Sequence, residues 1–199
     1  MKKIWTLALV CSTLTGFVAC NNAGSDDAIK SANESNEVKQ DSAENMAPDN
    51  SAAGVVSEQD SKFAVEAASG GMLEVQLGKL AQQKASSQKV KDFGALMVRD
   101  HTNANDELKA LAIKKNITLP PAPGEEHMNH IKELTDKSGK EFDKDYIDMM
   151  VSDHEEDVKK FEDCSQNGND AELKAFAAKT LPTLREHLNA VKKIQESLK

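Results

Sequence analysis

Apolar residues recur at helical spacing along most of the chain, beginning near Ser57. Steps of three and four residues place them on one face, which is the pattern of an amphipathic α-helix. The pattern predicts one long helix over residues 58–84 and a second over 87–115. The second helix ends before Leu119-Pro120-Pro121-Ala122-Pro123-Gly124, because proline cannot continue a helix and also restricts the residue before it.

The C-terminal half has the same organisation. A short helix over about 125–137 fills the connection, a third long helix covers about 140–164, and Asp170 is the expected N-cap of a fourth. No segment shows the period-two alternation of a strand. Four long helices with two short joints predict an all-α four-helix bundle over 58–199, with a short extra helix in its central connection.

Two strings in the second and third long helices echo each other: Met97-Val98-Arg99-Asp100-His101 and Met150-Val151-Ser152-Asp153-His154. A weaker echo links the starts of the second and fourth long helices. These echoes indicate two related hairpins. The long, proline-bearing link between the hairpins is where a crossover connection is expected.

The first twenty residues have the regions of a secretory signal. Lys2 and Lys3 give a positive start, and residues 4–18 form an apolar run too short for a comfortable membrane span. The run ends in Phe17-Val18-Ala19-Cys20, which resembles the bacterial lipobox, where small residues precede a cysteine that becomes lipidated. Residues 1–19 are therefore predicted to be a lipoprotein signal peptide. An ordinary signal peptide cut near Ala19, with Cys20 a free thiol, is the alternative.

Residues 20–57 are predicted to be the lipidated Cys20 followed by a disordered acidic tether. The stretch holds seven acidic residues, two lysines and no aromatic residue, so it cannot bury enough apolar surface to offset its ordering entropy. Asn21 and Asn22 stand where an inner-membrane retention signal favours aspartate. The sequence thus predicts a membrane partner reached through a lipid anchor, at the outer membrane of the cell envelope.

Composition excludes several classes of protein. The 199 residues contain 33 acidic and 25 basic side chains, and this net charge of −8 argues against nucleic acid as a partner. Aromatic residues make up only 4%, which argues against a β-sandwich or β-barrel. Three cysteines cannot build a disulfide framework, and Cys164 is interpreted as an inert thiol near a helix end.

Each long helix carries one ionisable residue on its apolar stripe. Burying such groups costs a few kcal/mol unless they find partners, and a metal ion is one such partner. The sequence therefore offers a candidate site for iron, copper or zinc, with these ligands: Glu74, His101, His154 and His187. The expected outer partners of the ligands are Asp100, Asp153, Glu186 and Tyr146.

The alternative to a metal site is a hydrogen-bonded polar network that fixes the register of the helices. Counting 1.5 Å per residue from the helix ends predicts two tiers of ligands about 6 to 12 Å apart, which is loose for one site. The Glu-x-x-His motif is absent, which argues against a di-iron centre, and the missing Cys-x-x-Cys-His excludes covalent haem. His127 and His130 are expected to face solvent.

Several strings taken together resemble the DUF4142 family, over about residues 60–196: Gly71…Glu74-Val75…Gly78-Lys79-Leu80-Ala81, Val90…Phe93…Met97-Val98…Asp100-His101, Phe142-Asp143…Tyr146…Met150…Asp153-His154 and Leu181-Pro182…His187-Leu188. The resemblance implies a ferritin-like four-helix domain in an exported bacterial protein, a type often labelled an outer-membrane protein. It implies no activity, because none is assigned to the family.

Two functional hypotheses follow. The first is a lipid-anchored cell-envelope protein whose bundle acts in binding or structure, with protein partners that the sequence does not name. The second is a metal-binding protein, with redox chemistry as an option, that uses the inward-facing glutamate and histidines. The absence of nucleotide, acyl-transfer and zinc-protease motifs favours a non-enzymatic role in both.

Overall fold

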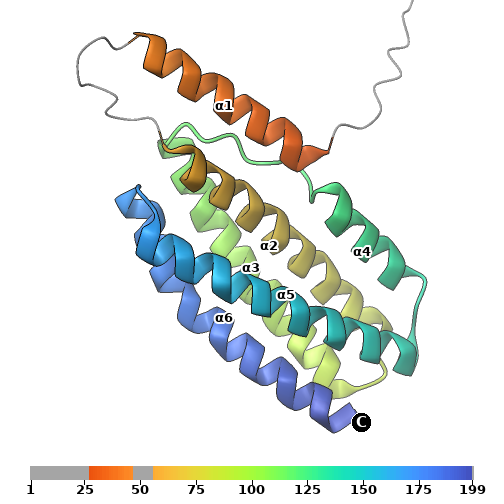
Figure 1. Cartoon of the computed structure of the whole chain (residues 1–199). Coiled ribbons are helices and arrows are strands. Elements are labelled where there is room, and N and C mark those ends of the chain that lie inside the picture. The colour runs from red at the N-terminus through yellow and green to blue at the C-terminus, as the bar shows by residue number, and fades with distance from the viewer. Residues whose placement is uncertain (1–26, 47–55, 199) are drawn as a thin grey trace, which may run out of the picture.

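Four long helices and two shorter ones appear in the computed structural model, which describes residues 27–46 and 56–198 (Figure 1). The helices are α1 (Ala28–Met46), α2 (Glu58–Lys84), α3 (Gln88–Lys114), α4 (Glu125–Thr135), α5 (Gly139–Asn167) and α6 (Ala171–Leu198). Helices α2, α3, α5 and α6 form an all-α, ferritin-like four-helix bundle, and α4 is the short helix in the central connection. The predicted fold class is confirmed.

Two antiparallel hairpins, α2–α3 and α5–α6, make up the bundle (Figure 1). Across the bundle, α2 packs on α5 and α3 packs on α6. The connection after α3 uses α4, which lies against α2 and carries the chain back to the end where α3 began. Helix α5 therefore starts beside the start of α3 and runs parallel to it, so the connection is a crossover.

The first hairpin is closely packed where Gly78 of α2 faces Gly94 of α3. A Cβ atom at Gly78 would lie 2.6 Å from the carbonyl oxygen of Gly94, and one at Gly94 would lie 2.7 Å from that of Gly78. Side-chain carbons do not tolerate such distances, so only glycine permits the two backbones to come this near. The glycine pair therefore fixes how α2 and α3 cross.

The buried apolar side chains form two clusters, one toward each end of the bundle. One includes Leu108 and Phe161 and lies toward the α5–α6 turn, and the other includes Phe93 and Ile147 and lies toward the α2–α3 turn. Between them is a polar layer, which we call the waist, composed of Glu74, His101, His154 and His187. The waist is enclosed by apolar packing above and below, so its polar groups are removed from bulk water.

A buried aspartate ties each hairpin turn to the opposite hairpin. Asp60, in the first turn of α2, accepts hydrogen bonds of 2.7 to 3.1 Å from the backbone N–H groups of residues 169–170, between α5 and α6. Asp143, near the start of α5, accepts bonds of 2.9 Å from the backbone N–H groups of residues 86–87, between α2 and α3. Each hairpin therefore supplies the acceptor that the other hairpin's turn requires.

Residues 28–46 form α1, so the prediction of a disordered tether is wrong for this segment. The helix lies on α2 and on the loop after α3, and polar contacts hold it there. Asn36 donates to the carbonyl of Thr118 at 3.0 Å and accepts from its N–H at 2.7 Å, while Gln40 donates to the carbonyl of Val56 at 3.0 Å. Only a few of its residues, such as Ala32, are buried, so the segment lacks the apolar stripe that reveals a helix in a sequence.

The predicted signal peptide (1–19), the lipidation site Cys20 and the rest of the predicted tether lie outside the described residues. Within the described ranges, no helix combines the length and the apolar character needed to cross a bilayer.

Candidate metal centre

The waist brings one side chain from each long helix to a single point. Glu74 comes from α2, His101 from α3, His154 from α5 and His187 from α6, and all four are buried. The centroids of the three imidazole rings lie 5.4 to 5.7 Å apart. One nitrogen of each ring lies within 4.8 Å of the corresponding nitrogens of the other two. The three candidate histidine ligands therefore meet.

The carboxylate of Glu74 touches two of the three rings. Its Oε2 lies 2.6 Å from Nδ1 of His101, and its Oε1 lies 3.4 Å from Nε2 of His154. Neither contact has hydrogen-bond alignment, so both oxygens are without a hydrogen-bond partner among the described residues. A buried carboxylate this close to imidazole nitrogens, yet not hydrogen-bonded to them, has the position of a ligand that shares a cation with the rings.

Each histidine leaves a ring nitrogen unpaired in the waist. His154 uses Nδ1 for a 2.9 Å contact with the carbonyl of Met150, one turn earlier, and its Nε2 has no hydrogen bond within the described chain. His187 uses Nε2 for a 2.9 Å bond to Asp100, and its Nδ1 is unpaired. His101 likewise has an unpaired Nε2. Because a carbonyl accepts only from N–H, the first contact fixes the tautomer of His154 with its lone pair on Nε2.

Asp100 supports His187 from outside the waist. Arg99 donates to its two oxygens at 2.7 and 3.0 Å, and His187 donates to one of them. Burial alone would raise the pKa of Asp100, but the hydrogen bonds from Arg99 and His187 hold it below its usual value. A carboxylate on the far nitrogen of a histidine orients the ring and makes the other nitrogen a better ligand. Asp100 thus lies where the sequence predicted an outer partner.

Burial controls the protonation of the waist. It lowers the pKa of His101 and of His154 to about 4 and lowers that of His187, so the rings are neutral at neutral pH. Burial also raises the pKa of Glu74 to about 7, against the opposing influence of His154. Neutral imidazoles are the form that binds a cation, and a bound cation would favour the ionised form of Glu74.

The predicted separation of the ligands into two tiers is wrong. That prediction counted His154 from the C-terminal end of its helix and His187 from the N-terminal end of its helix, as if α5 ran in the same direction as α2. The crossover through α4 makes α5 antiparallel to α2, so the position of His154 has to be counted from Gly139 and that of His187 from Leu198 (Figure 1). Measured from that end of the bundle, all four ligands lie roughly 10 to 15 residues in, a spread of about 8 Å that the side chains bridge.

Three other residues that were predicted to support the ligands from outside do not contact them as expected. Glu186 is exposed and points away from the waist, so its predicted supporting role is wrong. Asp153 is half-buried with an unpaired Oδ2, and burial together with Glu74 raises its pKa to about 8. Tyr146 is fully buried, its hydroxyl has no hydrogen-bond partner in the described chain, and burial raises its pKa. Neither side chain forms the predicted link to a ligand.

Two histidines of α4 and Cys164, the one thiol within the described ranges, complete the set of candidates. His127 and His130 are half-buried, so the prediction that they face solvent is wrong. The Nδ1 of His127 lies 2.7 Å from the hydroxyl of Ser69, which also accepts from the N–H of Gly124 at 2.8 Å, and these contacts fix α4 on α2. Cys164 is buried, and burial raises the pKa of its thiol to about 12, which makes it unreactive as expected.

The donor set of the waist is three imidazole nitrogens and one carboxylate. Imidazole selects zinc, copper, iron and related first-row metals over calcium and magnesium, which prefer all-oxygen sites. Three histidines and one carboxylate also provide the four ligands of a tetrahedral ion. Phe93 lies against the site, with its ring centroid 6.2 Å from that of His154 and 6.4 Å from that of His187. The chemistry of the site is therefore that of holding one ion in an enclosed, apolar setting.

Residues 45–194 match the family described as "Domain of unknown function (DUF4142)". No curated protein matches the chain. Two solved structures are similar in fold. A DUF305 fragment from Deinococcus radiodurans has a TM-score of 0.63 at 10% identity, covering 71% of this chain and 98% of its own. A DUF305 protein from Streptomyces coelicolor, described as secreted, has a TM-score of 0.60 at 12% identity, covering 70% and 93%.

Proposed function

This chain belongs to the DUF4142 family, and we propose that its bundle is a metal-binding domain that holds one first-row transition-metal ion in the waist. The observation that carries the proposal is the meeting of three buried imidazole rings, with one nitrogen of each within 4.8 Å of the others, beside a buried carboxylate whose oxygens have no hydrogen bond within the described chain. His101, His154 and His187 would supply the nitrogens, and Glu74 the oxygen.

A purely structural polar network explains the waist less well. In such a network the buried groups satisfy one another, and buried polar atoms in folded proteins are nearly always paired. Here five ligand atoms of the waist lack hydrogen bonds within the described chain, and each unsatisfied group costs about 1–3 kcal/mol. One cation at the centre would satisfy all four side chains together.

The ligand set supports zinc, copper or iron as the bound ion. All four ligands come from rigid helices, and none of the four is exposed, so the domain is better suited to holding an ion than to offering it an open position for substrate. The neutral histidines bind without losing a proton, whereas Glu74 ionises on binding. Metal affinity should therefore rise with pH through the range in which Glu74 gives up its proton.

The elemental content of the purified protein tests this proposal. The full chain, isolated without a metal-affinity tag, should carry close to one equivalent of zinc, copper or iron. His101→Ala and His154→Ala should lose the metal and keep their helical circular dichroism, while the matched control His130→Ala, on α4, should keep both. A wild-type chain that binds none of these metals after loading, with unchanged unfolding, would refute the metal centre and favour the polar network.

We propose in addition that the protein is exported and tethered to a membrane of the cell envelope through Cys20. The charged start, the apolar run and the lipobox-like end support this location, and one fold relative is described as secreted. Cys20→Ala should move the protein from the membrane pellet to the soluble fraction. Cys11→Ala, within the predicted signal, is the control and should stay in the pellet. Unchanged membrane partitioning of Cys20→Ala would contradict the anchor.

A further inference from the structure

A small cavity of about 40 Å³ between α2, α4 and α5 connects the surface with the waist. Its inner wall includes Glu74, and its rim includes Glu66, Glu156 and Lys160. Exposure increases outward, since the side chain of Glu74 is 2% exposed, that of Glu66 44% and that of Glu156 65%. We call this feature the access cavity. It leads from solvent to one of the proposed metal ligands.

Carboxylates line the access cavity at every depth. Asp153 and Asp157, one turn apart on α5, are half-buried in its wall between the rim and Glu74. Glu74 itself is buried, and neither of its oxygens has a hydrogen bond within the described chain. Asp153 also has an unpaired buried oxygen. A passage with carboxyl groups at its rim, along its walls and at its inner end offers a cation oxygen ligands at every depth.

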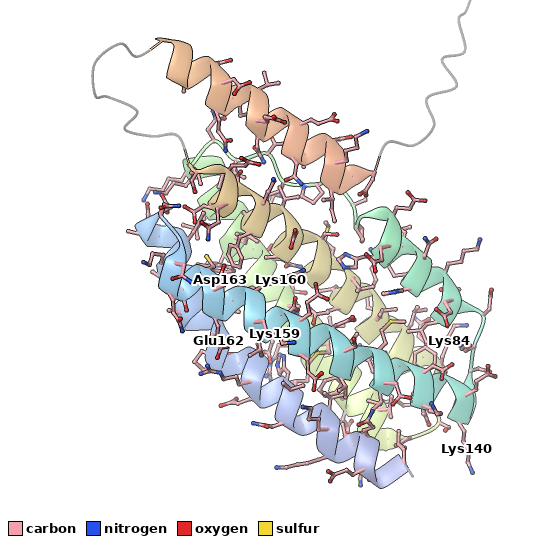
Figure 2. The ribbon with its side chains drawn as sticks, viewed as in Figure 1. Lys84, Lys140, Lys159, Lys160, Glu162 and Asp163 are labelled. Carbon is pink, nitrogen blue, oxygen red and sulfur yellow. The ribbon has the colours of Figure 1, made fainter. Side chains whose placement is uncertain are left out.

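Lys160 closes the rim of the access cavity. It extends from α5 (Figure 2). Its Nζ lies 2.7 Å from Oε1 of Glu156, on the same helix, and 3.1 Å from Oε2 of Glu66, on α2. Its ammonium thus lies between the two outermost carboxylates, where an incoming cation would first bind. The neighbouring Lys159 is exposed on the same helix and does not line the cavity, which makes it a matched reference (Figure 2).

We propose that the access cavity is the path by which a divalent cation reaches the waist, and that Lys160 is its removable plug; this inference rests on the proposed metal centre. A divalent cation outcompetes the single charge of Lys160 for Glu66 and Glu156, and the long, flexible lysine stem can then swing into solvent. The ion passes Asp157 and Asp153 to Glu74 and is transferred to the histidines. Lys160 therefore sets the rates of metal uptake and release.

Rapid mixing of the metal-free full chain with Zn²⁺ and a chromophoric zinc indicator tests the path. Lys160→Met should take up and release zinc faster, on the order of tenfold, because the competing charge is gone. The double variant Glu66→Gln/Glu156→Gln should take it up more slowly by a similar factor. Lys159→Met should match the wild type, and circular dichroism should show that all variants are folded.

The outcomes separate this inference from the metal centre itself. Stoichiometric zinc binding with wild-type rates in both Lys160→Met and the double variant would overturn the access path and leave the centre intact. A wild-type chain that takes up no zinc would refute the centre and the path together. The expected result is faster exchange in Lys160→Met and slower uptake in the double variant, with the equilibrium affinity changed much less than the rates.

Discussion

Replacing Glu74 by glutamine should stabilise the metal-free protein and destabilise the zinc-loaded one. Glutamine has the shape of glutamate without its charge, so the apolar packing around the waist is preserved. In the metal-free protein the change removes a carboxylate that is buried and without hydrogen bonds in the described chain. In the zinc-loaded protein it removes a ligand. A single substitution thus has opposite effects in the two states.

The size of the effect in the metal-free protein follows from the pKa of Glu74. Burial raises this pKa from 4.5 to about 7, so the unfolded chain releases the proton at lower pH than the folded chain does. The free energy of unfolding is therefore unaffected below pH 4.5 and decreases as pH rises toward 7. Above that range the loss approaches about 3 kcal/mol, since each pKa unit corresponds to about 1.4 kcal/mol. Glutamine does not suffer this loss.

Urea unfolding followed by circular dichroism measures the free energy of unfolding in both states, with and without zinc. Without metal, Glu74→Gln should exceed the wild type by about 3 kcal/mol at pH 8 and by under about 1 kcal/mol at pH 5. With saturating zinc at pH 8 the order should reverse, because loss of the ligand should weaken binding by more than about a hundredfold and each tenfold loss of affinity removes about 1.4 kcal/mol of ligand stabilisation. Glu66→Gln, at an exposed carboxylate of the same helix, is the control and should change stability by less than about 1 kcal/mol.

Two results would refute this reasoning. If metal-free Glu74→Gln is no more stable than the wild type at pH 8, the Glu74 carboxylate is satisfied in the folded state and its pKa is not raised. If zinc stabilises the variant as much as the wild type, Glu74 is not a ligand. The two results are independent, because the first concerns the metal-free protein alone.

Three further predictions concern the supports of the site and the fold. Asp100→Asn should weaken zinc binding by about 10- to 100-fold in an indicator titration without changing the stoichiometry, because it removes the charge that orients His187; unchanged affinity would contradict the role of Asp100. Gly78→Ala should lower the urea-unfolding free energy by about 2 kcal/mol or more, whereas Gly70→Ala, whose Cβ would meet its nearest neighbour at 3.9 Å, should raise it by up to about 1 kcal/mol; equal effects would disprove the close crossing. Asp143→Ala should cost about 3 kcal/mol in the same assay, since it leaves the backbone N–H groups of residues 86–87 without their charged acceptor, and a loss below 1 kcal/mol would argue against that tie.

The long helices could be predicted from the sequence because their boundaries have local causes. Apolar spacing predicted the bounds of α2, Glu58–Lys84, and the proline-rich stretch predicted where α3 ends. Asp170 was predicted as the N-cap of α6, and it accepts hydrogen bonds from the N–H groups of the first turn of that helix. The inward placement of the waist residues followed in the same way, since each lies on the stripe that the apolar residues define. Local periodicity reports which side of a helix is buried, and here that was sufficient.

The features that were missed depend on contacts between distant segments. The helix α1 is held by side-chain hydrogen bonds to the loop after α3, as between Asn36 and Thr118, and neither composition nor periodicity reveals such pairs. The level of His154 depended on the direction of α5, which is set by the crossover. Glu186 is next to His187 in sequence, but consecutive residues of a helix point about 100° apart, and here it points to solvent.

The reciprocal aspartate ties also bear on the order in which the protein folds as it is synthesised. The α2–α3 turn leaves the ribosome with its backbone N–H groups unsatisfied, because Asp143 follows Ser87 by 56 residues. The acceptor for the α5–α6 turn, Asp60, is made first, but the turn that it serves follows only 109 residues later. Neither hairpin contains the acceptor for its own turn, so a nascent chain gains little stability by folding one hairpin early. Native structure should form in one late, all-or-none step once the second hairpin is available.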